Sequence, residues 1–167
     1  ATPRQLPAAD GMDGVFELRH PDDAARLRAA AANASSAIVI GGGYIGLEVA
    51  ATLAKSGKDV TVIEAAPRLL ARVASPAISA FFADLHADAG TTVITDVGVE
   101  DIAGDHGGFS HVTLSDGRQL SADMLVVGIG VTPETALAEA AGIETGNGIL
   151  VDAGMQTSVA GIYAIGD

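Results

Sequence analysis

The sequence predicts an α/β fold in which helices flank a parallel sheet and an antiparallel β-meander forms a crossover between two parts of that sheet. Three observations support this fold. Apolar runs of strand length at 37–40 and 60–63 enclose a helix-like run at 47–54. Short strand-like runs separated by glycine-rich turns follow between residues 97 and 120. A wholly apolar run at 124–127 is typical of a buried parallel strand.

The elements before residue 90 follow from start and stop signals. Residues 1–20 are expected to be irregular, and a helix is expected from Asp22 to Ala32 behind Pro21. Another helix is expected from Ser75-Pro76 to about Asp88. Its apolar residues are spaced for one buried face, and they are Ile78, Phe81, Phe82 and Leu85. The pair Phe81-Phe82 is therefore assigned to the core.

The elements after residue 90 are shorter. A β-branched strand is expected at 91–95, and the meander strands are expected at 97–103, 109–114 and 118–120. Beyond the buried strand, Pro133-Glu134 is expected to start a short helix that ends near Ala141. The last expected elements are short strands, at 148–151 and 161–165.

The most informative motif is the glycine turn that links the strand at 37–40 to its helix. In this turn, Gly41 permits a tight bend, Gly43 lets a ligand approach the backbone, and Gly46 permits close packing of the helix. Helix N-terminal amides lack intrahelical partners and favour an anion. This strand–turn–helix–strand pattern predicts a Rossmann-like unit that binds a dinucleotide through its pyrophosphate.

Glu64 ends the second strand of this unit, eighteen positions after Gly46, where the pattern expects an acid at about 20. A carboxylate there accepts hydrogen bonds from a ribose 2′-hydroxyl and repels a 2′-phosphate. NAD is therefore favoured over NADP, although Arg68 could offset part of the repulsion. Gly128 ends the 124–127 strand, so we expect it at the same edge of the sheet as Gly43 and Glu64.

Composition excludes several function classes. The 167 residues suffice for one ordinary domain, and a net charge of -12 disfavours nucleic acid and anionic membrane surfaces as partners. Cysteine is absent, which removes disulfides and CxxC chemistry from this segment and fits a reducing cytoplasm. The start, without Met or a signal peptide, suggests an excised piece of a longer protein. No metal site is expected, because metal-ligand spacing is missing among the histidines, His20, His86, His106 and His111.

Four stretches together resemble one family, and they span residues 41–51, 64–73, 127–133 and 162–167. In order and spacing they are similar to the FAD-dependent, NADH-using ferredoxin reductases, which include the rubredoxin and putidaredoxin reductases. The resemblance implies three segments. Residues 1–35 would be a flank of an FAD-binding domain plus a helix, 36–155 the NAD-binding domain, and 156–167 the start of the return to the FAD-binding domain.

The resemblance also implies site residues. Those expected to bind NAD(H) are Gly41, Gly43, Tyr44, Ile45, Gly46, Glu48, Glu64, Arg68, Arg72, Gly128, Ile129 and Gly130. Within this set, Arg68 and Arg72 would lie along the adenosine, and Gly128 and Ile129 would line the nicotinamide half. Glu48 would lie near the nicotinamide carboxamide, or else be a surface carboxylate. Arg19 and Asp167 would contact FAD in the longer enzyme.

The implied activity is electron transfer by a flavoprotein oxidoreductase, from NADH through FAD to a ferredoxin- or rubredoxin-like carrier. No residue of this segment is expected to be catalytic, because the cofactors carry the chemistry. The isolated fragment is expected to bind dinucleotide weakly without turnover. Two alternatives stay open, namely the same domain in an NADH oxidase or nitrite reductase type of flavoprotein, and a non-catalytic NAD-binding redox sensor.

Overall fold

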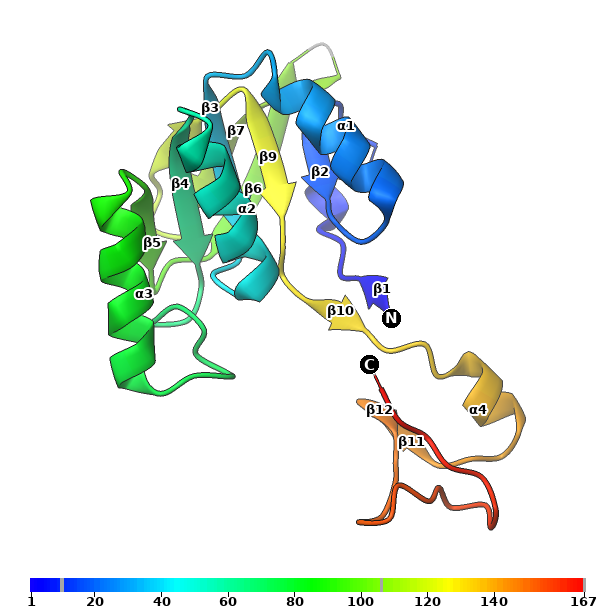
Figure 1. The fold of residues 1–167 in the computed structure, drawn as a ribbon. Coiled ribbons are helices and arrows are strands. Elements are labelled where there is room, and N and C mark those ends of the chain that lie inside the picture. Colours follow the sequence, from blue (N-terminus) through cyan, green and yellow to red (C-terminus); the bar gives the residue numbers. More distant parts are fainter. Residues whose placement is uncertain (10, 106, 167) are drawn as a thin grey trace. The chain divides into compact units, whose positions relative to one another are not determined.

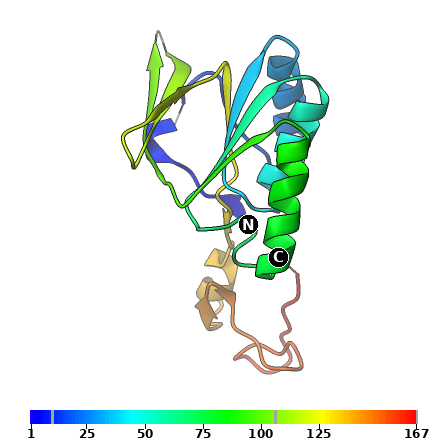
Figure 2. The same ribbon diagram turned by 90° about the vertical axis from the view of Figure 1, so that its left-hand side faces the viewer.

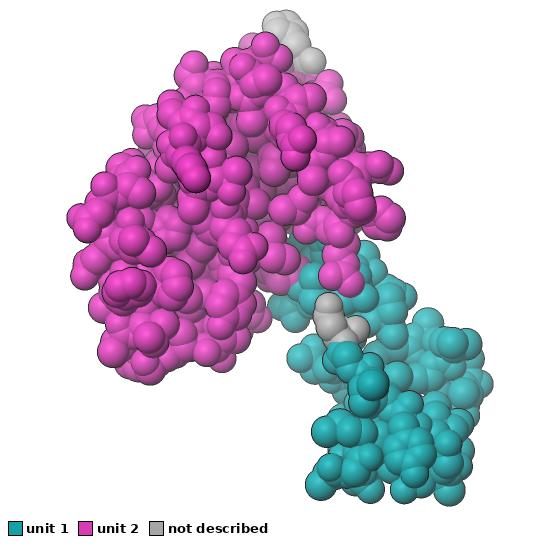
Figure 3. Space-filling view, viewed as in Figure 1, with its two compact units in different colours: residues 1–4, 131–167 teal, residues 5–130 magenta. Residues whose placement is uncertain are grey.

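The computed structural model describes residues 1–9, 11–105 and 107–166. The chain divides into two compact units (Figure 3), one formed by residues 5–130 and the other by residues 1–4 together with 131–167. In the smaller unit, β1 (Thr2–Pro3) pairs antiparallel with β10 (Val131–Thr132). This unit also contains α4 (Ala136–Ala140) and a hairpin of β11 (Thr145–Gly146) and β12 (Gly148–Ile149).

The larger unit is built on a parallel sheet with the strand order β2-β9-β3-β4-β5. Its strands are β2 (Val15–Glu17), β3 (Ser36–Ile40), β4 (Asp59–Glu64), β5 (Thr92–Thr95) and β9 (Met124–Val127). The helices are α1 (Pro21–Ala31), α2 (Tyr44–Lys55) and α3 (Pro76–Asp88), and a 3-10 turn, η1, covers Pro7–Ala9.

An antiparallel sheet forms the third layer of this unit, from β6 (Val99–Asp105), β7 (Gly108–Leu114) and β8 (Gln119–Ser121). The helices cover one face of the parallel sheet and the antiparallel sheet covers the other (Figures 1 and 2). The meander carries the chain from β5 at one edge of the parallel sheet to β9 on the far side of β3. The predicted fold class and the predicted crossover are both confirmed.

Burial on both faces explains why the central strands are apolar throughout. On the helical face, Val39 and Val62 pack in one cluster with Leu47 of α2. On the other face, Ile38 packs in a second cluster with Val112 of β7. Successive side chains of a strand alternate between the two clusters, and the relative positions of the strand ends are fixed by packing from both sides.

The predicted buried face of α3 is wrong. Ile78 and Phe81 are 47% and 59% exposed, Leu85 is 50% exposed, and Phe82 is half-buried. The face that packs inward is rotated by one residue and carries Ser79, Phe82, Ala83 and His86. Ser79 can lie inside because its hydroxyl is hydrogen-bonded there. Burial of His86 lowers the pKa of its imidazole.

Several short elements also differ from expectation. Val15–Glu17 lies in the stretch expected to be irregular, yet it forms the edge strand β2 through its pairing with β9. No strand forms at 161–165 within the described residues, where Tyr163 makes an isolated bridge with Gln156. The hairpin partner at Thr145–Gly146 was not expected. Among the described residues, no helix is long and apolar enough to cross a membrane.

Asp23 fixes the start of α1. Its Oδ2 accepts hydrogen bonds from the main-chain N–H of His20 (2.7 Å) and of Arg19 (3.0 Å), and its Oδ1 accepts one from Arg26 (2.6 Å). These interactions, the His20 main-chain bond foremost, lower the pKa of Asp23 from 3.8 to about 2. In the folded protein, the ionised form of the Asp23 side chain is therefore stabilised relative to the protonated form.

We predict that Asp23→Asn lowers the free energy of unfolding by about 1 kcal/mol at pH 7. Because the folded-state pKa is depressed, this stabilisation is present above the unfolded pKa and is lost as the pH falls from 3.8 through about 2. Urea denaturation from pH 7 down to pH 2 measures it, with Asp22→Asn as the matched control. An undiminished difference between the wild type and Asp23→Asn at pH 2 would contradict this account.

Candidate functional site

The carboxyl ends of three neighbouring strands meet at one edge of the parallel sheet. The main-chain N–H of Gly41, after β3, donates to Ile63 O in β4 (2.8 Å), and the N–H of Gly128, after β9, donates to Ile40 O (2.8 Å). The structure thus brings together the strand ends that the sequence placed at a common edge. This is where ligands bind in open parallel sheets.

The glycine turn is closely packed at two positions. Gly41 has a φ of 109°, and a Cβ there would collide with the carbonyl oxygen of Gly128. A Cβ on Gly46 would collide with the carbonyl oxygen of Gly41. Helix α2 therefore approaches the turn, and the turn approaches the end of β9, more closely than any side chain would permit.

Gly43 is different, because its missing side chain faces open space. A Cβ there would meet nothing within 4 Å. Gly43 is the N-cap of α2, and its carbonyl accepts the first helical hydrogen bond, from Leu47 N (3.0 Å). The amides of the following first turn lack intrahelical acceptors by helix geometry. Tyr44 and Ile45, which supply two of them, are 59% and 41% exposed.

Glu64 lies directly beside this turn. Its Oε2 accepts a hydrogen bond from Gly42 N (2.6 Å), and its Oε1 accepts one from Ala66 N (2.7 Å). The side chain is half-buried. Each carboxylate oxygen has a second lone pair, so Glu64 can hold the turn and still accept a hydrogen bond from a ligand hydroxyl.

The sequence did not identify Gly42 as a site residue. A Cβ at this position would lie 2.5 Å from Leu69 Cδ2 and 3.1 Å from Glu64 Cβ. The carbonyl of Gly42 accepts a hydrogen bond from Leu70 N (2.9 Å). Leu70 itself has a φ of 52°, and no pattern in the sequence indicated that a leucine would adopt this conformation.

The two predicted arginines lie in different settings. The guanidinium of Arg68 is engaged within the protein, by Ala71 O, Ala74 O and Ser79 Oγ. Arg72 is exposed, and its Nη2 would lie 3.5 Å from a Cβ on Gly130. Arg72 therefore extends toward the chain after β9, the region predicted for the nicotinamide half, rather than only along the side predicted for adenosine.

The remaining predicted residues are placed as follows. Glu48 is exposed on α2, one turn after Tyr44, and Ile129 is half-buried against the cluster under the meander. Arg19 is exposed near the start of α1. Asp167 and His106 lie outside the described residues. Within the described part of the chain, no group of three His, Cys, Asp or Glu residues could hold a metal ion.

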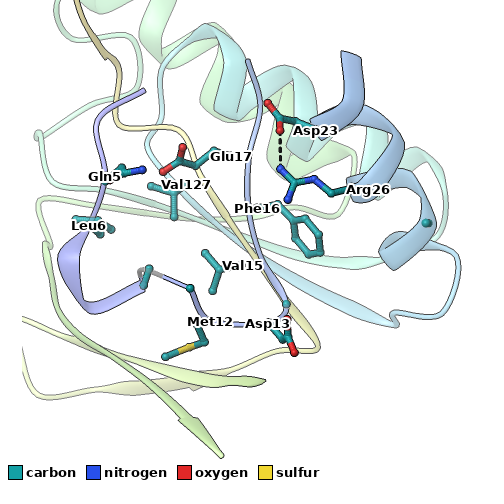
Figure 4. A pocket seen from close by; sticks show the side chains of 14 residues that line it. Gln5, Leu6, Met12, Asp13, Val15, Phe16, Glu17, Asp23, Arg26 and Val127 are labelled. Atoms are coloured by element: carbon teal, nitrogen blue, oxygen red, sulfur yellow. Dashed lines mark hydrogen bonds and ion pairs between the residues drawn. The ribbon is translucent and has the colours of Figure 1, made fainter. Parts of the chain in front are cut away.

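One hollow of the larger unit lies elsewhere, between η1, β2 and α1 (Figure 4). It measures about 600 Å³, with Val15, Phe16 and Met12 among its apolar lining. Its polar lining includes the ion pair of Asp23 with Arg26. None of the residues predicted to bind a dinucleotide lines this hollow, so it does not define the candidate site.

Comparisons with known proteins show which family the chain is similar to. The family described as pyridine nucleotide-disulphide oxidoreductase matches residues 1–167. A ferredoxin–NAD(P)(+) reductase from Sphingomonas is 43% identical over 156 residues, covering 93% of this chain and 38% of that protein. A rubredoxin-NAD(+) reductase from Pseudomonas putida is 43% identical over 157 residues, covering 93% and 40%.

A solved structure is similar over almost the whole chain. The putidaredoxin reductase in a covalent putidaredoxin reductase–putidaredoxin complex has a TM-score of 0.91 and 40% identity, covering 99% of this chain and 41% of that one. The chain spans about 40% of the length of these relatives. The resemblance inferred from the four sequence stretches is confirmed.

We predict that Gly46→Ala destabilises the fold much more than Gly43→Ala does. Gly46→Ala should lower the free energy of unfolding by about 3 kcal/mol or more, since its Cβ would meet main-chain atoms that cannot rotate away. Gly43→Ala should cost about 1 kcal/mol or less, since the space is open and the backbone is extended. Urea denaturation of both variants measures this, and equal losses would contradict the packing described.

Proposed function

Because the chain belongs to the pyridine nucleotide-disulphide oxidoreductase family, we propose that it is the NADH-binding domain of an FAD-dependent oxidoreductase. In the longer enzyme, electrons pass from NADH through FAD to a ferredoxin- or rubredoxin-like carrier. The carrier class is proposed from the relatives, which are named as reductases of ferredoxin and rubredoxin and, in one structure, are bound to putidaredoxin.

The observation that carries the proposal is the open N-cap of α2 beside the carboxylate of Glu64. Gly43 leaves room for a ligand to approach the main chain, and the unpaired amides with the helix dipole favour a pyrophosphate. Glu64 lies within hydrogen-bond distance of Gly42 N, and we propose that its carboxylate accepts a hydrogen bond from a ribose hydroxyl. A net charge of -12 is compatible with this ligand, because the amides supply the local positive potential.

Contacts around Glu64 favour NADH over NADPH. A 2′-phosphate would lie against the Glu64 carboxylate. Arg68, the cation expected to offset this repulsion, has its guanidinium engaged by Ala71 O, Ala74 O and Ser79 Oγ. When NADH is bound, its reduced nicotinamide ring would supply a hydride. The role of this chain is to hold that ring in position through contacts with the rest of the dinucleotide.

The flanking segments complete the proposal for the longer enzyme. Residues 1–35 would comprise a flank of an FAD-binding domain and a helix, and residues 156–167 would begin the return to that domain. Residues 36–155 would form the NAD-binding domain. Arg19 and Asp167 would lie near the flavin. A cytoplasmic location is proposed because the sequence lacks cysteine and nothing in it requires an oxidising compartment.

We predict that this chain binds NADH at least about tenfold more tightly than NADPH, and that Glu64→Gln weakens NADH binding by about tenfold. The substitution keeps the side-chain length and removes the negative charge, so the preference between the two nucleotides should narrow. Isothermal titration calorimetry measures both affinities.

Two further variants complete this titration experiment. Glu100→Gln, on the exposed side of β6, is the matched control and should leave both affinities unchanged. Gly43→Ala should weaken NADH binding without unfolding the chain, because its methyl group occupies the space proposed for the pyrophosphate. Equal or tighter binding of NADPH by the unmodified chain would refute the specificity, and absence of NADH binding would refute the proposed function.

For the longer protein that contains this chain, we predict a yellow preparation with flavin absorbance and NADH-dependent reduction of a ferredoxin or rubredoxin. Carrier reduction followed by absorbance distinguishes this function from the alternatives. A colourless protein would favour the redox-sensor alternative, and rapid oxygen consumption without carrier reduction would favour the NADH oxidase.

A further inference from the structure

The chain between β4 and α3, residues 67–74, closes around the side chain of Arg68. Arg68 Nη1 donates hydrogen bonds to Ala74 O (2.8 Å) and to Ser79 Oγ (2.7 Å), and Nη2 donates to Ala71 O (2.8 Å). These acceptors lie on the same connector and on the first turns of α3. The guanidinium therefore fixes the connector from inside and is already occupied by protein acceptors.

Ser79 extends this network into the core. It is 3% exposed, and its hydroxyl donates to Leu69 O (2.6 Å) while accepting from Arg68. We call this arrangement the Arg68 brace; it consists of Arg68, Ser79 and the acceptors on residues 69–74. Hydrogen bonds from a charged donor are stronger than neutral ones, and a planar guanidinium serves acceptors in several directions at once.

Leu70 lies within the braced stretch in a costly backbone conformation. Leu70 has a φ of 52°, in the left-handed region that non-glycine residues seldom adopt. Such a residue persists only where its surroundings hold it there. Leu70 is 4% exposed, and its main-chain N–H donates to the carbonyl of Gly42 (2.9 Å). Residues 69–74 are therefore bonded to Arg68 and Ser79, and through Leu70 N they are also bonded to the glycine turn.

The Leu70 hydrogen bond orients the peptide between Gly42 and Gly43. This peptide is trans, and in a planar trans peptide the C=O and the N–H point in opposite directions. Because the carbonyl of Gly42 points to Leu70, the N–H of Gly43 points away from the connector. Glu64 holds the preceding peptide through Gly42 N. Both peptides that flank Gly42 are thus fixed before any ligand arrives.

We propose that Arg68 is a positioning residue for the pyrophosphate of the dinucleotide, acting through Leu70 and Gly42 instead of by contact with the ligand. The inference rests on the proposed function, since it assigns a supporting residue to the same site. Without the brace, Leu70 can relax to a negative φ, its N–H leaves Gly42, and the Gly42–Gly43 peptide rotates freely. The ligand must then order that peptide itself, which weakens binding.

The test compares Arg68→Ala and Ser79→Ala with the unmodified chain, using Arg118→Ala as the control for loss of an arginine. Arg118 lies outside the site and pairs with Asp116 in a surface turn. Amide hydrogen exchange of Leu70, followed by NMR, measures whether the brace holds. Titrations with ADP-ribose and with adenosine separate pyrophosphate binding from adenosine binding.

We expect Arg68→Ala to weaken ADP-ribose binding by about tenfold, with the adenosine affinity changed less than about twofold. The Leu70 amide should lose its protection from hydrogen exchange, while the amides of β4 should keep theirs. Ser79→Ala should show the same pattern with a smaller loss, and it carries the test if Arg68→Ala fails to fold. The Arg118→Ala control should match the unmodified chain.

Two results would overturn the inference. One is unchanged ADP-ribose affinity in both brace variants, and the other is an equal loss for adenosine and ADP-ribose, which indicates general loosening instead of pyrophosphate positioning. Failure of the unmodified chain to bind ADP-ribose would instead remove the proposed function itself, and this inference with it.

Discussion

The hydrogen bond from Gly42 N to Glu64 Oε2, 2.6 Å long, is the interaction on which the candidate site depends. It joins the turn after β3 to the last residue of β4, so the acid proposed to select the nucleotide and the turn proposed to receive it are one structural unit. The second oxygen of Glu64 holds Ala66 N and directs the chain into the connector. The Glu64 carboxylate therefore fixes the conformation of the turn and the start of the connector, and it also supplies the local negative charge.

The layers of the larger unit explain how this interaction is held in place. Helices and an antiparallel sheet cover opposite faces of the parallel sheet, and each face has its own apolar cluster. Strands packed on both sides have little freedom to slide, so their carboxyl ends present main-chain groups at fixed positions. The site itself consists mostly of backbone, which suits a ligand recognised by amides and by one carboxylate.

Much of this arrangement could be predicted from the sequence, because it follows from local patterns. The glycines at 41, 43 and 46, the apolar strands and the acid at 64 each have a clear physical reason. The inward face of α3 could not be predicted, because a hydrogen-bonded serine replaces an apolar residue there and the more apolar stripe remains exposed. Arg68 was predicted to contact the ligand. Its three acceptors within the protein were not predicted, because its position four residues after Glu64 gives no sign of them. The left-handed conformation of Leu70 was not predicted, because its main-chain N–H bonds to Gly42, a residue far away in the sequence.

The conformation of Leu70 also has a consequence for how this surface segment can change in length. Loops on protein surfaces usually tolerate added or deleted residues. Here the stretch from Leu69 to Ala74 has its register set at both ends, by the bond to Gly42 and by the guanidinium inside the loop. A one-residue insertion or deletion would move a different residue into the left-handed position and detach the turn. We therefore expect variation in this segment to be confined to side-chain identity, as it is in a helix or strand.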